Sequence, residues 1–175
     1  AANVAAATSY TNKIDAGSVR WEKIDDYGRT DSSMTIFPVT AQSVMPPQNS
    51  PFLEYKMFIF HPGNLDIELI VAPTLNFVPG RGLRTAVSFD DQQPQIIEIL
   101  PAKFDARNGN SNWEQSVRDS VRKVKSTHKV TGAGYHTLKV WMVDPGVVLQ
   151  KVVVDRGGVK PSYLGPPESH YRGAR

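Results

Sequence analysis

Residues His136 to Pro167 read HTLKVWMVDPGVVLQKVVVDRGGVKPSYLGPP, and this stretch decides the fold of the chain. It contains two apolar β-type runs, Thr137–Val143 and Val147–Val154, on either side of the turn sequence Asp144-Pro145-Gly146. We expect the two runs to pair as the closing hairpin of a β-sandwich, with their valines in the core. Because the stretch carries no evident nucleophile, it indicates binding and architecture rather than catalysis.

Strand patterns recur upstream of this stretch, as alternating apolar and polar residues or as runs of strong β-formers. Phe52–Phe60 and Leu65–Val71 flank the turn sequence His61–Asn64, so we expect these two strands to form another hairpin. Further strands are predicted over Ser9–Thr11, Val19–Ile24, Met34–Val39, Leu83–Phe89, Gln95–Leu100 and Ser126–Val130.

One segment has the spacing of a helix instead. It is predicted to start at Ser111–Asn112, with the Asn112 side chain as its N-terminal cap. Its apolar face is expected to comprise Trp113, Val117, Val121 and Val124. Roughly nine strands and at most one short helix indicate an all-β protein, an antiparallel β-sandwich that forms a single domain over residues 1–175. We expect the tail to fray from about residue 168.

The composition of the 175 residues limits the classes of function. There are no cysteines, which excludes disulfides, cysteine-ligated zinc and thiol catalysis. The net charge of +3 arises from 20 basic and 17 acidic residues, a surplus too small and scattered for a nucleic-acid-binding surface. No apolar run approaches the roughly 20 residues of a membrane-spanning helix. Neither nucleic acid nor a membrane is therefore an expected partner.

Several motifs along the chain resemble those of a known family. In chain order they are Trp21-Glu22, Gly28-Arg29-Thr30, Pro73–Phe77, Gly82-Leu83-Arg84, Ala86–Asp91, Trp141–Lys151 and Lys160–Ser169. In sequence and order they are similar to the C-terminal domain of the xylan α-glucuronidases of glycoside hydrolase family 115. The resemblance covers nearly the whole chain.

The resemblance implies a β-sandwich of the jelly-roll type, galactose-binding-like and akin to carbohydrate-binding modules. In those enzymes the catalytic machinery lies in preceding domains, so the resemblance implies that this chain is not catalytic by itself. No cofactor is expected. A structural calcium ion stays open as an alternative, although this chain has Ala5-Ala6-Ala7 where related sugar-binding sandwiches often have an acidic residue.

Residue patterns that would point to an enzyme have simple structural explanations here. A glycosidase needs two carboxylates that flank the scissile bond, but the adjacent pairs Asp25-Asp26 and Asp90-Asp91 fall in turn sequences, where both side chains are normally solvated. The histidines lack the close spacing of a metal site; they are His61, His128, His136 and His170. We therefore expect no catalytic residue and no metal ligand.

Aromatic side chains beside polar loops are the expected sugar-binding residues, because a pyranose ring stacks on an aromatic face while its hydroxyls need donors and acceptors. Trp113 is the leading candidate, since it follows a polar loop that contains Asn108 and Asn112. By fold-level analogy with galactose-binding-like modules, Asp144 and the loop Tyr27–Arg29 would supply neighbouring contacts.

Each tryptophan also has a structural interpretation. Trp113 would pack the short helix onto the core together with Val117 and Val121. Trp21 lies within a strand that runs into a polar loop, so both a ligand contact and core packing stay open. Trp141 lies in the middle of a strand, which favours packing.

Three arginines could recognise an acidic sugar. The guanidinium groups of Arg29, Arg81 and Arg84 match a carboxylate in geometry, and glucuronoxylan carries uronic acid side groups. The alternative is that each arginine pairs with a nearby aspartate across a loop, and the strand position of Arg84 favours that alternative.

We expect a non-catalytic module that binds plant cell-wall polysaccharide, xylan or glucuronoxylan, and that is attached to the catalytic domains of an α-glucuronidase. The main alternative is a structural or dimerisation domain of that glycoside hydrolase with no ligand of its own. A third interpretation is that activity belongs only to the full-length parent, of which this chain is the excised end. A polysaccharide substrate implies a secreted or periplasmic protein.

Overall fold

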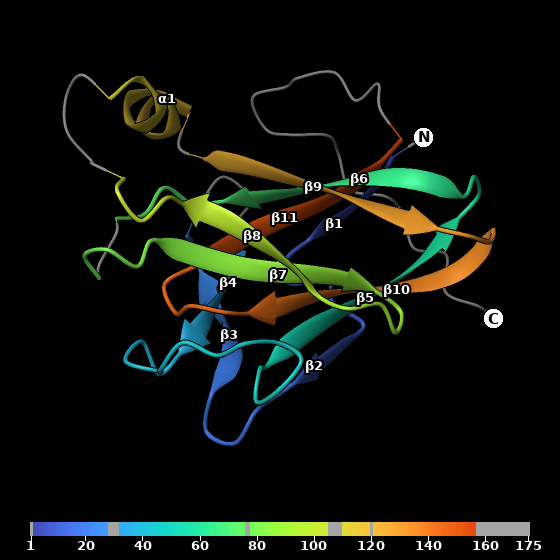
Figure 1. The fold of residues 1–175 in the computed structure, drawn as a ribbon, viewed down its shortest axis with the longest axis horizontal. Coiled ribbons are helices and arrows are strands. Elements are labelled where there is room, and N and C mark those ends of the chain that lie inside the picture. Colours follow the sequence, from blue (N-terminus) through green and yellow to red (C-terminus); the bar gives the residue numbers. More distant parts are fainter. Residues whose placement is uncertain (1, 28–31, 76–77, 105–109, 120, 157–175) are drawn as a thin grey trace.

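A computed structural model describes residues 2–27, 32–75, 78–104, 110–119 and 121–156, which form two antiparallel sheets packed face to face (Figure 1). One sheet has six strands in the order β3-β4-β11-β6-β9, with β1 also paired to β11, and the other has five in the order β2-β5-β10-β7-β8. The elements are β1 (Asn3–Ala6), β2 (Asn12–Ile14), β3 (Arg20–Asp25), β4 (Ser32–Phe37), β5 (Phe52–Ile59), β6 (Gly63–Val71), β7 (Leu83–Phe89), β8 (Gln95–Leu100), α1 (Ser111–Asp119), β9 (Arg122–Val130), β10 (Gly134–Met142) and β11 (Val148–Asp155). The predicted all-β antiparallel sandwich is confirmed.

The core lies between the two sheets and follows from the alternation of side chains along each strand. In β10, for example, Leu138, Val140 and Met142 point inward and are almost fully buried. The central strand β11 is buried on both faces, because a second cluster covers its outer side. That cluster comprises Val4, Ile70, Val121 and Val153. The valines of the two runs Thr137–Val143 and Val147–Val154 are therefore core residues, as expected, except that Val148 is only partly buried.

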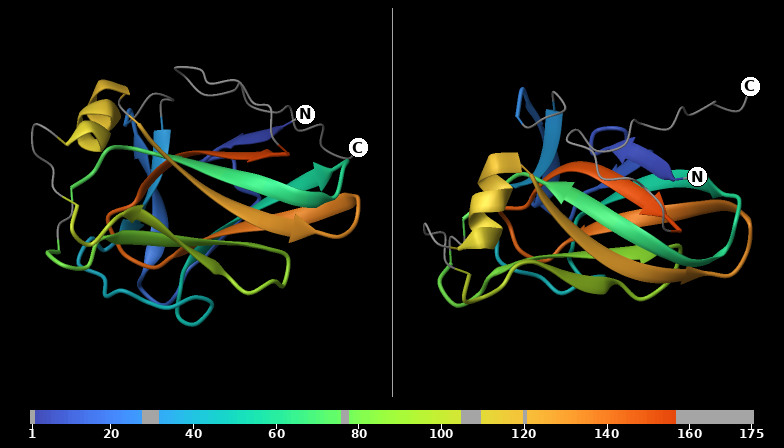
Figure 2. Two further views of the ribbon diagram at one scale, coloured as in Figure 1. Left: turned by 45° about the horizontal axis from the view of Figure 1, so that its top comes forward. Right: turned by 90° about the horizontal axis from the view of Figure 1, so that it is seen from above.

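Both predicted hairpins are wrong, because their strands belong to different sheets. β10 pairs with β5 and β7 in the five-stranded sheet, whereas β11 pairs with β1, β4 and β6 in the six-stranded sheet. Likewise β5 and β6 lie in opposite sheets. A short turn between two apolar runs looks the same in sequence whether the chain folds back beside itself or crosses the sandwich. The turn at Asp144 is such a crossing, and Figure 2 shows the two layers that it joins.

The ends of several elements also differ from the predictions. The small residues at the start form β1, and the next strand is Asn12–Ile14 instead of Ser9–Thr11. Strands β7 and β8 have the predicted bounds. The helix is capped by Asn110, whose side-chain oxygen accepts hydrogen bonds from the backbone N–H groups of Asn112 and Trp113 at 3.2 and 3.4 Å. Asn112 is therefore inside the helix and is not its cap.

The apolar face predicted for the helix is also wrong. The helix ends at Asp119, and Val124 belongs to β9. Val117 is 50 % exposed, whereas Val121 is buried just beyond the helix. The predicted helical spacing of four and three residues ran past the end of the helix and included Val124, which belongs to a strand. Within the described residues, no helix is long and apolar enough to cross a membrane. The predicted fraying from residue 168 lies outside the described residues.

The loop between β4 and β5, residues 38–51, which we call the covering loop, is attached to the end of β10. Three hydrogen bonds fasten it there: Val44 N–H donates to the Val143 carbonyl at 2.9 Å, Met142 N–H to the Pro51 carbonyl at 3.1 Å, and Ser50 Oγ to the Met142 carbonyl at 2.7 Å. The loop therefore reaches the turn at Asp144.

Candidate ligand-binding site

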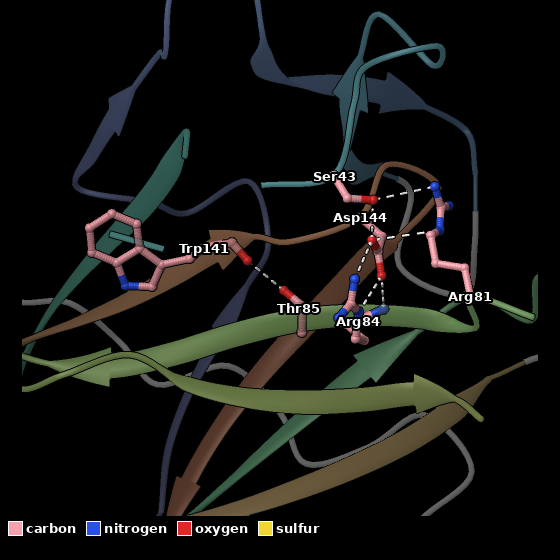
Figure 3. A network of polar contacts seen from close by, with 6 residues as sticks. All are labelled: Ser43, Arg81, Arg84, Thr85, Trp141 and Asp144. Carbon is pink, nitrogen blue, oxygen red and sulfur yellow. Dashed lines mark hydrogen bonds and ion pairs between the residues drawn. The ribbon is translucent and has the colours of Figure 1, made fainter. Parts of the chain in front are cut away.

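The carboxylate of Asp144 is the centre of a polar cluster at the crossing between the sheets (Figure 3). Its side chain is fully buried. Arg84, the second residue of β7, donates from Nε to Oδ2 at 2.9 Å and from Nη2 to Oδ1 at 3.1 Å, and its backbone N–H donates to Oδ2 at 2.9 Å. Ser43 of the covering loop donates its hydroxyl to Oδ1. A single carboxylate thus joins the crossing turn, β7 and the covering loop.

A second guanidinium, that of Arg81, faces the same carboxylate at longer distances. Arg81 Nε lies 3.6 Å from Asp144 Oδ1, and Nη1 lies 3.4 Å from Ser43 Oγ. The Nε atom is buried, and among the described residues it has no hydrogen-bond partner. About a fifth of the Arg81 side chain is exposed, so the group reaches the surface. Two cations therefore share one buried anion, and only Arg84 is bound closely.

The charge state of the cluster is settled by its neighbours. Burial by itself would raise the pKa of Asp144, but hydrogen bonds from Arg84 and Ser43 and the charges of both arginines outweigh it and hold the pKa below its ordinary value. Asp144 is therefore ionised at neutral pH. Glu98, on the exposed side of β8, lies across from Arg84 in the sheet register and adds a weaker attraction. Of the two arginines in the cluster, Arg81 therefore has the weaker pairing with negative charge.

The backbone around the cluster is fixed by close packing. Gly82 has a φ of +74°, and a Cβ atom at this position would lie 2.5 Å from the Leu100 carbonyl oxygen, so only glycine fits between the two arginines. Thr85, next to Arg84, donates to the Trp141 carbonyl at 2.7 Å (Figure 3). The indole of Trp141 is nearly buried and donates to Ser88 Oγ at 2.9 Å, which agrees with its expected packing role.

Trp113, the leading candidate from the sequence, lies on α1 at the same end of the sandwich as the crossing turn (Figure 1). Its ring is partly buried and meets the ring of Phe104 edge to face, with 6.2 Å between centroids. Asn112 beside it is exposed. Asp144, which was expected to supply a neighbouring contact to the sugar, is buried beneath its arginines and can act on a ligand only through them.

The other residues that were predicted to contact a ligand differ in their environments. Trp21 is fully buried, and its indole N–H donates to the Pro51 carbonyl at 3.1 Å, so it belongs to the core and offers no face to a sugar. Tyr27 is 46 % exposed beyond the end of β3, and its carbonyl accepts a hydrogen bond from the Ser33 hydroxyl. Asn108 and Arg29 lie outside the described residues.

An exposed aromatic cluster was missed in the sequence. Phe58, Phe60 and Tyr135, which we call the aromatic platform, are 38 %, 69 % and 58 % exposed. Phe58 lies 4.7 Å from Phe60 and 5.2 Å from Tyr135 between ring centroids. The even-numbered positions of the run Phe52–Phe60 share one face, which was a usable signal, but Tyr135 joins them only through the register of β5 and β10.

Metal binding finds no support in the described residues, which contain no cluster of three or more histidine, aspartate or glutamate side chains suited to a metal ion. Ala7, at the position considered for calcium, is fully buried. His136 bridges Asp90 and the Gly132 carbonyl, at 2.7 Å from each, and His128 lies 2.9 Å from Ser126 Oγ. These histidines are held in structural contacts.

Solved structures with this fold include carbohydrate-binding proteins. A family 6 carbohydrate-binding module of a Zobellia galactanivorans laminarinase matches 89 % of the chain and 100 % of its own length, with 14 % identity and a TM-score of 0.54. A family 35 module from Clostridium thermocellum matches 88 % of the chain and 97 % of its own length, with 7 % identity and a TM-score of 0.56. At these identities the likeness shows the fold alone.

A third structure is that of a family GH115 4-O-methyl-α-glucuronidase, described as specific for decorated arabinogalactans. It matches 86 % of the chain with 18 % identity and a TM-score of 0.58, and the matched part is 18 % of that enzyme. No curated protein matches the sequence. The model of the glycosyl hydrolase family 115 C-terminal domain matches residues 4–168. The chain therefore belongs to the family of C-terminal domains of family 115 glycosyl hydrolases.

Proposed function

We propose that this chain is a non-catalytic module of an α-glucuronidase, and that it binds plant cell-wall polysaccharide, xylan or glucuronoxylan, at the end of the sandwich that holds Asp144. Family membership and the fold shared with carbohydrate-binding modules support the general class of function. The choice of an acidic xylan rests on the chemistry of the two arginines.

The observation that carries the proposal is the incomplete pairing of Arg81. Asp144 takes up the guanidinium fork of Arg84 with two close hydrogen bonds, whereas the contacts of Arg81 in the cluster are 3.4 and 3.6 Å long. A loosely paired guanidinium keeps donors for a further acceptor, and a ligand carboxylate that approaches the exposed part of the Arg81 side chain from solvent would supply that acceptor. The uronic acid side groups of glucuronoxylan carry that carboxylate.

Polar and aromatic groups nearby suit the rest of such a ligand. Trp113 and Asn112 lie at the same end of the sandwich and offer a ring and an amide beside a bound sugar. Hydrolysis would remain the task of the parent enzyme's other domains, and a polysaccharide ligand places the protein outside the cytoplasm, secreted or periplasmic.

Retention on insoluble glucuronoxylan tests the proposal. The isolated chain should be retained, and Arg81→Gln should lower retention several-fold without changing the circular dichroism spectrum. Arg20→Gln is the matched control, because Arg20 is a partly exposed arginine that forms an ion pair with Glu22 within β3, so the variant should bind as the wild type does. If the wild type is retained on no polysaccharide, the binding proposal fails and the structural accessory domain becomes the better account.

A further inference from the structure

The aromatic platform lies at the end of the sandwich opposite α1, where β5 ends and β10 begins (Figure 1). Alternation fixes the direction of its side chains. Leu53, Tyr55 and Leu138 are almost fully buried in the core, so Phe58 and Tyr135, at positions of the opposite parity, stand on the outer face of the five-stranded sheet. Phe58 and Tyr135 are direct partners in the register.

Polar pairs continue the same outer face toward the middle of the sheet. The next cross-strand pair is Lys56 with Thr137, and the one after it is Glu54 with Lys139. The ammonium of Lys56 lies 4.9 Å from the centre of the Tyr135 ring. Lys56 is exposed, and the other three side chains are partly exposed. A row of aromatic surface is thus followed directly by donors and acceptors on two adjacent strands.

The covering loop leaves this part of the sheet open. Its anchors are at Met142 and Val143, where the neighbouring Trp141 is only 7 % exposed and packs against Phe52, while Tyr135 at the other end of the same strand is 58 % exposed. The platform is therefore exposed surface on two strands that are paired with each other at this point, so the sheet register holds Phe58 and Tyr135 side by side before a ligand binds.

The size and composition of the surface favour a sugar over a protein partner. Aromatic side chains expose about 200 Å² each when free, so the three rings offer about 300 Å² at their observed exposures. A stable protein interface needs about 800 Å² on each partner and a core depleted of charges. Here charged residues begin one pair away from the rings. A pyranose, with an apolar C–H face and a rim of hydroxyls, matches a small ring surface bordered by charges.

We propose that the outer face of β5 and β10 is a second carbohydrate-binding surface, on which a pyranose of a neutral glycan chain stacks against Tyr135 and Phe60 and the next sugars lie over the polar pairs. This proposal rests on the function proposed above, because it assumes a polysaccharide ligand. It differs in its chemistry, since no ligand carboxylate is required. About 30 Å of strand separates Tyr135 from Asp144, so the two surfaces are distinct.

Affinity electrophoresis and calorimetry with neutral xylohexaose, unsubstituted xylan, glucuronoxylan and arabinogalactan test this surface. Tyr135→Ala and Phe60→Ala should weaken binding of at least one neutral glycan tenfold or more, whereas Tyr135→Phe should keep most of it because the ring remains. Val117→Ala is the matched control: Val117 is 50 % exposed on α1, at the other end of the sandwich, and its removal should change nothing. All variants alter exposed side chains, and their melting temperatures should match the wild type.

The outcomes separate the two proposals. If glucuronoxylan binding depends on Arg81 but both platform variants bind every glycan as the wild type does, this second surface is refuted and the proposed function stands. If the platform variants change only self-association in sedimentation, the surface is a protein contact and the inference is overturned. Failure of the wild type to bind any of the four glycans refutes both proposals.

Discussion

The guanidinium of Arg84 makes two hydrogen bonds to the carboxylate of Asp144, at 2.9 and 3.1 Å, although the two residues are 60 positions apart. Arg84 belongs to the five-stranded sheet, and Asp144 lies where the chain crosses to the six-stranded sheet. The pair therefore fixes the crossing to β7, and it also aligns the neighbouring Arg81 with the surface. Stability and the proposed recognition of uronic acid depend on the same carboxylate.

Replacement of Asp144 tests its structural role. Asp144→Asn should lower the free energy of unfolding by about 2 kcal/mol at pH 7, because a buried amide cannot replace the charged acceptor of three hydrogen bonds from Arg84. Urea unfolding followed by tryptophan fluorescence measures this difference. Asp15→Asn is the control, since its exposed ion pair with Lys13 should contribute less than about 0.5 kcal/mol.

The same pair predicts a dependence on pH. Because the pKa of Asp144 is lower in the folded protein than its ordinary 3.8, its stabilising effect is present above that value and is lost as the pH falls through the folded-state pKa. The difference between wild type and Asp144→Asn should therefore be smaller at pH 3 than at pH 7. An equal difference at both pH values would contradict an ionised, paired Asp144.

Two glycines near the site provide a matched pair. Gly80 and Gly82 have φ values of +78° and +74°, so alanine is strained in both, by about 1 kcal/mol. Only at Gly82 would the added Cβ also meet backbone atoms, at 2.5 Å from the Leu100 carbonyl oxygen, while at Gly80 nothing lies within 4 Å. Gly82→Ala should therefore cost at least 2 kcal/mol more than Gly80→Ala in urea unfolding, and equal costs would show that Gly82 is not confined as described.

His136 should stabilise the protein in its charged form. A hydrogen bond to Asp90 first, then one to the Gly132 carbonyl and the Asp90 charge, raise the pKa of His136 above its ordinary 6.5 despite partial burial. A group whose pKa is raised on folding stabilises the folded state fully at pH values below its ordinary pKa. This stabilisation is lost as the pH rises through the folded-state pKa. The stability of the wild type relative to His136→Gln should thus be greater at pH 5.5 than at pH 8.5. The comparison cancels the opposite effect of His128, whose pKa burial lowers. A relative stability that grows with pH would contradict the bridge.

Trp113→Ala tests the leading candidate from the sequence. If the ring stacks on a bound sugar beside Arg81, the variant should be retained on insoluble xylan several-fold less strongly than the wild type. The loss of its edge-to-face contact with Phe104 should cost about 1 kcal/mol of stability. Retention equal to that of the wild type would limit Trp113 to packing the helix.

The sequence was sufficient for the fold class and for several strand positions, because these depend on local alternation. β7 and β8 were predicted with the bounds that the structure has. The pairing of strands was not predictable, since the turns at Asp144 and after β5 carry the same residues in a hairpin and in a crossing. Contacts between residues that are far apart in the sequence could not be predicted either. The pairing of Arg84 with Asp144 and of Tyr135 with Phe58 exists only through the sheet register.

Two residues that were predicted to contact a ligand are buried in the structure, and their sequence patterns did not reveal this. Trp21 lies in an alternating strand that runs into a polar loop, which left a ligand contact open, yet its side chain is fully buried and its indole N–H donates to the Pro51 carbonyl. Asp144 has the composition of an exposed turn, but the covering loop and two arginines enclose it. The alternative of an arginine paired with a nearby aspartate is correct for Arg84, whereas Arg81 lies farther from the same aspartate and Arg29 lies outside the described residues.

The most direct measurement of the central claim is calorimetric titration of the isolated chain with a xylo-oligosaccharide that carries one glucuronic acid, compared with the same oligosaccharide without it. We expect the acidic oligosaccharide to bind at least tenfold more tightly, with the preference lost at high salt and in Arg81→Gln, because screening and removal of the guanidinium both weaken the ion pair. Binding of neither oligosaccharide, or equal binding of both that is unaffected by Arg81→Gln, would contradict the account.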